Sequence, residues 1–240
     1  MQQPPIEVAA RPTLPPRFII AIDGPAAVGK SSVAGGLADR LGMVLLNTGA
    51  MYRAAAAVVI ERSIDDRDAG AVCAAVRAVD LHFDWSARPP RIYLGGRDVS
   101  ERINLPDVTE RVAALSAIPQ LRELMVGWQQ QIAREHPHLV AEGRDQTSVV
   151  FPDAELKVFL DASPEVRARR RAEQNRRKNL PADEAAIMRD IRQRDQIDYN
   201  KPVGRLIRTS DSVYLDSSAL DRDGVIAALE QLARARLAKG

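Results

Sequence analysis

The stretch Phe18–Ser31, FIIAIDGPAAVGKS, decides the fold of this chain. It contains an apolar run rich in β-branched residues, a loop bounded by glycines, and the start of an amphipathic helical pattern. The loop matches G-x-x-x-x-G-K-[ST], in which backbone N–H groups and a helix N-terminus surround a phosphate. In this motif the lysine reaches the β- and γ-phosphates and the hydroxyl binds Mg²⁺. We therefore predict a phosphate site in which Ser31 is the metal ligand. The predicted phosphate-binding loop comprises Gly24, Pro25, Ala26, Ala27, Val28, Gly29, Lys30, Ser31 and Ser32.

Composition limits the remaining possibilities. The chain has 240 residues, of which 45% are hydrophobic and 28% charged, which is typical of one α/β core with a small insert. A formal net charge of +2 argues against a nucleic-acid or acidic-membrane partner. The single cysteine, Cys73, excludes an internal disulfide and favours a cytoplasmic location. Residues 1–16 carry five prolines and no apolar core of a signal peptide, so we expect a disordered, proline-rich leader.

Strand-like and helix-like segments alternate along most of the chain. Five short apolar runs, bounded by helical patterns, predict a five-stranded, doubly wound parallel sheet. These runs lie at residues 18–22, 43–46, 139–141, 156–160 and 213–215. We assign residues 17–62, 106–166 and 205–240 to this α/β core. Because ligands bind beyond the carboxyl ends of such strands, the residues that follow each strand are the candidate site.

Two regions interrupt the core. Residues 63–105 contain three short β-like runs, and Gly95-Gly96 between two of them indicates a hairpin in a small mixed or antiparallel insert. Residues 167–204 form an arginine-rich helical region. Seven cations between positions 167 and 178 face a single acid, Glu173, and Arg167, Arg170 and Arg171 share a helical face. Such a run repels itself unless an anion binds it, which favours a lid that closes over a triphosphate. A solvated helix face is the alternative.

Two strand ends carry arginines. Thr48–Arg53 follows the second predicted strand, and Glu142–Asp145 follows the third. Arg53 and Arg144 can each hold an anion there, although a solvated helix charge and a loop salt bridge are the respective alternatives. Farther along the chain, the i, i+4, i+7 spacing of Arg194, Asp198 and Lys201 places them on one helical face.

Several of these segments together resemble the bacterial cytidylate kinases, a family of P-loop nucleoside monophosphate kinases. They are Ile22–Ser31, Thr48–Arg53, and Glu142–Asp145 followed by Val149–Ala154, and the resemblance covers residues 17–238. It implies that the loop binds the phosphates of ATP and that CMP or dCMP accepts the γ-phosphate. The residues that it implies for CMP are Thr48, Tyr52, Arg53, Arg122, Arg144 and Asp145. It places Arg167, Arg170 and Arg171 in the lid, and Arg194, Asp198 and Lys201 near the acceptor phosphate and ribose.

The sequence departs from the family pattern at a few positions. Lys201 stands where the family commonly has arginine, and Ala113 stands where a base-contacting serine is usual. These two changes bear on base and ribose selectivity more than on the chemistry. Glu142 and Asn47 both replace a common acidic residue in the pattern, and Gln146-Thr147 replaces an apolar residue and a glycine, which predicts a stiffer loop.

Phosphoryl transfer needs alignment, charge neutralisation and exclusion of water rather than a covalent intermediate. We expect Lys30, Mg²⁺ and the lid arginines to neutralise charge, and Arg53, Arg144 and Arg194 to position the acceptor phosphate. Two other interpretations stay open: a kinase of a small non-nucleotide acceptor, such as a shikimate-type kinase, and an ATP-binding regulatory or RNA-associated module. We expect a monomer whose partners are nucleotides.

Overall fold

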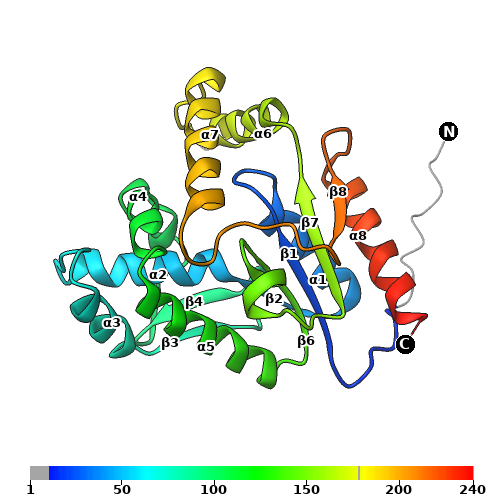
Figure 1. Ribbon diagram of the computed structural model, residues 1–240, viewed down its shortest axis with the longest axis horizontal. Coiled ribbons are helices and arrows are strands. Elements are labelled where there is room, and N and C mark those ends of the chain that lie inside the picture. The colour runs from blue at the N-terminus through cyan, green and yellow to red at the C-terminus, as the bar shows by residue number, and fades with distance from the viewer. Residues whose placement is uncertain (1–10, 178, 240) are drawn as a thin grey trace.

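Five parallel strands form the central sheet of the computed structural model, which describes residues 11–177 and 179–239 (Figure 1). In spatial order they are β2 (Val44–Asn47), β6 (His138–Gly143), β1 (Phe18–Asp23), β7 (Leu156–Asp161) and β8 (Val213–Asp216). Strand β1 lies in the middle, so the loop that follows it opens at the centre of the sheet edge. The predicted parallel sheet is confirmed, because every pairing in it is parallel.

Helices cover both faces of the sheet. Alternate side chains of β1 point to opposite faces: Phe18, Ile20 and Ile22 join one buried cluster, whereas Ile19 and Ala21 join the other. The first cluster is closed by α1 (Lys30–Leu41) and α8 (Arg222–Leu237). The second is closed by α2 (Thr48–Glu61), α3 (Ala69–Arg77), α4 (Pro106–Leu115) and α5 (Pro119–Glu135). Burial of both faces explains the mostly apolar runs of the inner strands β6, β1 and β7. The edge strand β8 is exposed along most of its length.

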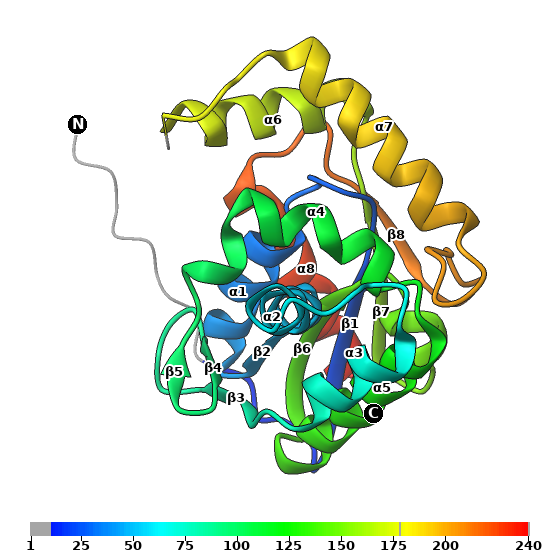
Figure 2. The same cartoon turned by 90° about the vertical axis from the view of Figure 1, so that its left-hand side faces the viewer.

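Helix α2 lies at the centre of the second layer, and Figure 2 looks along its axis. Residues 54–59 of this helix are all buried, because the sheet lies on one side of it and α3 and α4 lie on the others. The alanine-rich sequence allows this close packing on all sides. Asn47 caps the helix by accepting a 2.9 Å hydrogen bond from the Ala50 N–H, so the amide at this position performs a capping role that an acid can also perform.

The insert contains a separate antiparallel sheet of β3 (Leu81–Asp84), β4 (Arg91–Leu94) and β5 (Arg97–Asp98). Gly95 and Gly96 connect β4 to β5 with φ of 55° and 80°, a left-handed geometry that confirms the predicted hairpin. A 3₁₀ turn, η1 (Arg102–Asn104), then leads into α4.

Two further helices, α6 (Pro164–Arg177) and α7 (Glu184–Asn200), form an arm above the carboxyl end of the sheet (Figure 1). The remaining element is a π-helical turn, η2 (Gln146–Val150), which follows β6. In the described part of the chain, every helix is too short or too polar to cross a lipid bilayer.

The predicted leader is described only from Arg11 onward, and its first ten positions lie outside the described residues. Residues 11–16 form no helix or strand. Leu14 nevertheless packs against the cluster beneath α1 and α8, and the Pro15 carbonyl lies 2.7 Å from the His138 ring nitrogen Nε2.

Candidate active site

A cleft of about 970 Å³ opens at the carboxyl ends of β1, β2 and β6. It is walled by the loop after β1, the first turns of α2, and the arm formed by α6 and α7. All but four of the predicted site residues line it. The four that do not are Gly24, Pro25, Ala26 and Arg167.

The phosphate-binding loop turns sharply between β1 and α1. A Cβ atom at Gly24 would collide with the Leu160 carbonyl of β7, so only glycine lets the loop leave the sheet here. Gly29 has φ of 101° and Ala27 has φ of 60°, which places both in the left-handed region. These turns bring Ala27, Val28 and Gly29 to the cleft wall, followed by the N-terminus of α1.

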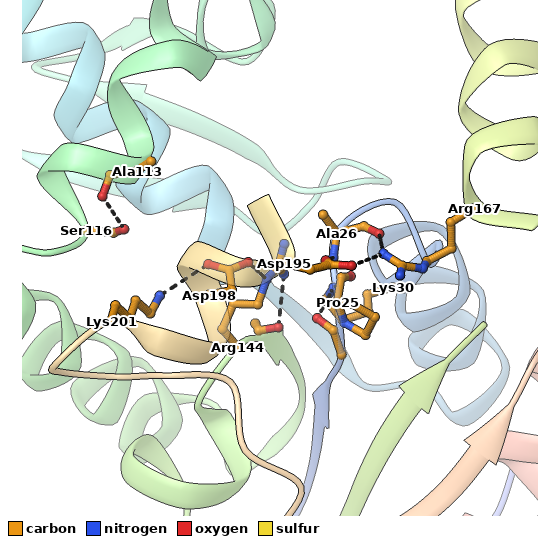
Figure 3. A network of polar contacts seen from close by, with 12 residues as sticks. Pro25, Ala26, Lys30, Ala113, Ser116, Arg144, Arg167, Asp195, Asp198 and Lys201 are labelled. Atoms are coloured by element: carbon orange, nitrogen blue, oxygen red, sulfur yellow. Dashed lines mark hydrogen bonds and ion pairs between the residues drawn. The ribbon is translucent and has the colours of Figure 1, made fainter. Parts of the chain in front are cut away.

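Lys30 lies buried at the base of this loop. Its Nζ donates to the carbonyls of Gly24 and Pro25, each at 2.8 Å (Figure 3). Burial, reinforced by the nearby Arg144 guanidinium, lowers the pKa of Lys30 to about 7. A bound phosphate would place a negative counter-charge beside this ammonium and stabilise its charged form.

Ser31 and Glu142 meet between α1 and β6. The Ser31 hydroxyl donates a 2.6 Å hydrogen bond to Glu142 Oε1. Glu142 is in register with Ile22 of β1 and Asn47 of β2, so its carboxylate stands beside the phosphate-binding loop. A hydroxyl and a carboxylate are hard oxygen donors of the kind that Mg²⁺ prefers, and therefore this pair fits a magnesium ion.

Three arginines from different elements converge deeper in the cleft. Arg53 comes from α2, Arg144 follows β6, and Arg194 comes from α7. Burial lowers the pKa of Arg53 and of Arg194, and mutual repulsion within this group lowers both further. Arg53 Nε is buried without a hydrogen-bond partner among the described residues. This part of the cleft is therefore prepared for an anion.

Asp198 balances part of this charge. It accepts a 2.6 Å hydrogen bond from Arg144 Nε and lies 3.5 Å from Lys201 Nζ (Figure 3). Burial disfavours the charged Arg144 side chain, but Asp198 outweighs burial and raises the pKa of Arg144. The expected face of Arg194, Asp198 and Lys201 thus points into the cleft as a mixed-charge surface.

The far end of the cleft contains a buried polar group. Arg122 pairs with Asp145 and donates a 3.3 Å hydrogen bond to Tyr52 Oη. Thr48 donates to the Glu142 carbonyl at 2.8 Å. Ala113 of α4 lines the cleft and brings no hydroxyl. The Ser116 hydroxyl lies one turn later on the same wall and donates to the Ala113 carbonyl at 3.1 Å (Figure 3).

The structure places the predicted lid arginines in three different environments. Arg171 remains on the cleft wall and, within the described part of the chain, donates to Gln174, its neighbour on α6. Arg170 also lines the cleft, but its guanidinium donates to the carbonyls of Ser217 and Leu220 at 2.6 and 2.9 Å. Arg167 does not line the cleft, contrary to the prediction, because Asp195 and backbone carbonyls occupy its guanidinium.

The expectation that the arginine-rich run lacks counter-charges of its own is also corrected. Acids on α7 pair with it: Asp195 with Arg167 at 2.7 Å, and Glu184 with Arg176 at 2.9 Å. These acids follow the run in sequence, so a count within the run alone overlooks them.

Three acids near the cleft were missed as site residues in the sequence: Asp23, Glu142 and Asp195. Asp23 is fully buried and accepts hydrogen bonds from the backbone N–H groups of Gln146 and Thr147 and from the Thr147 hydroxyl. An aspartate that ends an apolar strand was the available signal, since a buried carboxylate needs several donors. The Thr147 side chain, at a position of departure from the family pattern, supplies one of them.

Comparison with known proteins identifies the family. A family model described as "Cytidylate kinase" matches residues 20–235. A cytidylate kinase from Mycolicibacterium paratuberculosis is 44% identical over 218 residues, which are 91% of this chain and 96% of that protein. One from Nocardia farcinica is 40% identical over 223 residues, covering 93% and 96%. One from Oceanobacillus iheyensis is 39% identical over 204 residues, covering 85% and 88%. The chain belongs to the cytidylate kinase family.

Proposed function

We propose that this protein transfers the γ-phosphate of ATP to CMP or dCMP and releases ADP with CDP or dCDP. One observation carries the proposal: a phosphate-binding loop and a second cluster of arginines line the same cleft. Two phosphate sites in one cleft suit a reaction in which both donor and acceptor are nucleotides. Membership in the cytidylate kinase family supports the same acceptor.

The chemistry follows from charge and position. The loop and Lys30 hold the donor phosphates, while Arg53, Arg144 and Arg194 hold the acceptor phosphate in line with them. An acceptor phosphate is already an anion and needs no general base, so the transfer proceeds without a covalent intermediate. Arg170 and Arg171 neutralise charge from the arm side of the cleft. Each of these cations stabilises the transition state more than the ground state, because negative charge accumulates beside it in the transition state.

Ser31 and Glu142 would hold Mg²⁺, Ser31 through its hydroxyl and Glu142 through its carboxylate. When bound, the ion offsets the charge of the donor phosphates and fixes their orientation. Glu142 has a longer side chain than the aspartate that is common at this position in the family. It reaches the Ser31 hydroxyl directly, as their 2.6 Å hydrogen bond shows.

At the nucleoside end, Tyr52, Arg122 and Asp145 recognise the base, with Thr48 beside them. Asp198 and Lys201 contact the ribose. The insert and the α6–α7 arm act as a base-binding domain and a lid, and their closure excludes water during transfer.

The protein acts as a monomer in the cytoplasm, with nucleotides as its ligands and without a nucleic-acid or membrane partner. A single chain provides all the groups named above, which supports the monomer. The unpaired Cys73 fits a reducing compartment, and the near-zero net charge gives no electrostatic reason for binding nucleic acid.

A panel of acceptors tests this function. ADP release from Mg·ATP is measured in a coupled assay with CMP, dCMP, UMP, AMP or shikimate as the only acceptor. We expect turnover with CMP and dCMP well above that with AMP, and none with shikimate. Turnover with shikimate alone would establish the small-acceptor kinase instead. If none of the five acceptors supported ADP release, the proposal of a nucleotide kinase would be refuted.

A further inference from the structure

The backbone of Ala26, in the middle of the phosphate-binding loop, is held from both sides by side chains of the arm (Figure 3). Its N–H donates to Asp195 Oδ1 at 3.2 Å, and its carbonyl accepts from Arg167 Nη1 at 3.0 Å. Arg167 and Asp195 also pair with each other at 2.7 Å. We propose that these two residues, the Ala26 clamp, are positioning residues that keep the loop in the shape that binds ATP. The inference rests on the proposed function.

The clamp is part of the interior and not of the cleft wall. Arg167 is 4% exposed and Asp195 9% exposed, and neither lines the cleft. Arg167 is itself anchored, because its Nε donates to the Ala162 carbonyl beyond the end of β7 at 2.9 Å. The pair therefore acts on ATP through Ala26 and does not touch it.

The loop has a specific need for such a clamp. Ala27, the next residue, has φ of 60°, a left-handed conformation that costs an alanine free energy that glycine does not lose. Conformations of this kind persist only when their surroundings fix them. Fixing both polar groups of the Ala26 backbone limits the ways in which Ala27 can relax. Without the clamp, Ala27 would leave the left-handed region and the N–H groups that follow it would turn away from the phosphates.

The clamp also connects parts of the chain that are remote in sequence. Arg167 lies on the first turn of α6 and Asp195 lies on α7, whereas Ala26 belongs to the loop after β1. The arm thus contributes to ATP binding through its base as well as through Arg170 and Arg171 on the cleft wall. Among the acceptor groups, Arg53, Arg122 and Arg144 belong to other elements, whereas Arg194 shares α7 with Asp195. Because most acceptor groups lie outside the arm, the clamp should affect the donor more than the acceptor.

The test removes both charges of the clamp together. The variant Arg167→Met/Asp195→Leu leaves no unpaired buried charge, and Arg192→Gln is its matched control. Arg192 pairs with Glu165 at 3.5 Å between the same two helices, but both side chains are exposed. Binding of a non-hydrolysable Mg·ATP analogue is measured by calorimetry, and KM is measured separately for ATP and CMP.

We expect the double variant to bind the ATP analogue about tenfold more weakly, with KM for CMP changed less than about twofold. The control variant should match the wild type in both. Analogue binding equal to that of the wild type would overturn the clamp. A parallel rise in both KM values would do the same, because it would indicate a general structural role. If the wild type itself does not bind the analogue, the proposed function fails instead.

A second substitution makes the test specific. Ala27→Gly removes the cost of the left-handed conformation, so adding it to the double variant should restore a large part of the lost analogue affinity. Absence of any rescue would contradict the assigned role. Should the double variant fail to fold, Arg167→Lys and Asp195→Asn, which retain part of the hydrogen bonding, are measured with and without Ala27→Gly and judged by the same rescue.

Discussion

Lys30 is the residue whose charge we expect to respond most directly to a bound nucleotide. In the structure it is buried, its ammonium is bonded to two carbonyls, and its pKa is lowered to about 7. Phosphate oxygens beside Nζ would favour the charged form and raise this pKa again. The complex then holds more protons than the free protein at any pH between the two pKa values.

This difference predicts that binding of Mg·ATP at pH 8 takes up about one proton. The sign follows from linkage: the affinity for ATP decreases as pH rises above about 7, until the pKa of Lys30 in the complex is reached. Calorimetry in buffers of different ionisation enthalpy measures the uptake. Lys30→Ala should abolish it and lower turnover about a hundredfold or more, with an unchanged circular dichroism spectrum. Proton release, or near-normal turnover in the variant, would contradict the role of Lys30.

Among the elements, the segment after β6 matters most for the cleft, because it carries Arg144 and Asp145. Glu142 lies near the end of this strand, Arg144 and Asp145 follow it, and η2 begins at the next residue. Asp23 of β1 fixes the start of η2 through three hydrogen bonds of 2.7–2.9 Å. The carboxylate is fully buried, and burial raises the pKa of Asp23 despite these donors. An interaction outside the cleft therefore fixes the turn that follows Arg144 and Asp145.

The variant Thr147→Val tests the contact between Asp23 and η2. The substitution removes one donor from a buried carboxylate, so we expect a loss of about 1–3 kcal/mol in the free energy of unfolding. We also expect KM for CMP to rise more than KM for ATP, because Arg144 and Asp145 adjoin η2. Thr109→Val is the matched control, since its hydroxyl donates to the Leu105 carbonyl in an exposed helical turn. Equal effects of the two substitutions on KM for CMP would rule out a special role for Thr147.

The elements themselves were largely predictable from sequence, and the contacts between them were not. Prolines at the first helical positions fixed the starts of α5 and α6, and Gly42, with φ of 70°, ends α1 as expected. The residues that follow the predicted strands also identified much of the cleft wall in advance. Pairing of Arg167 with Asp195 was hidden, because no local pattern shows which distant acid neutralises a given cation. The same limit concealed Asp23, whose donors lie more than 120 residues away.

In the whole molecule, the order of the strands brings the phosphate-binding loop and the cluster of arginines to the same edge of the sheet. Strand β1 lies between β6 and β7, and β6 lies between β1 and β2. The phosphate-binding loop after β1 therefore opens beside Arg53 and Arg144, which follow β2 and β6. The arm lies above this edge of the sheet (Figure 1), and residues of α6 and α7 line the same cleft. We propose that ATP and CMP occupy this one cleft, with their phosphates facing each other between Lys30 and Arg53.

A bisubstrate analogue shows whether both nucleotides occupy this cleft together. In it, adenosine and cytidine are joined through their 5′-oxygens by a chain of five phosphates. We predict that one molecule binds per chain, that it competes with both ATP and CMP, and that Lys30→Ala and Arg53→Met each weaken its binding. Competition with only one of the two nucleotides, while the other still binds freely, would show that donor and acceptor do not share the cleft.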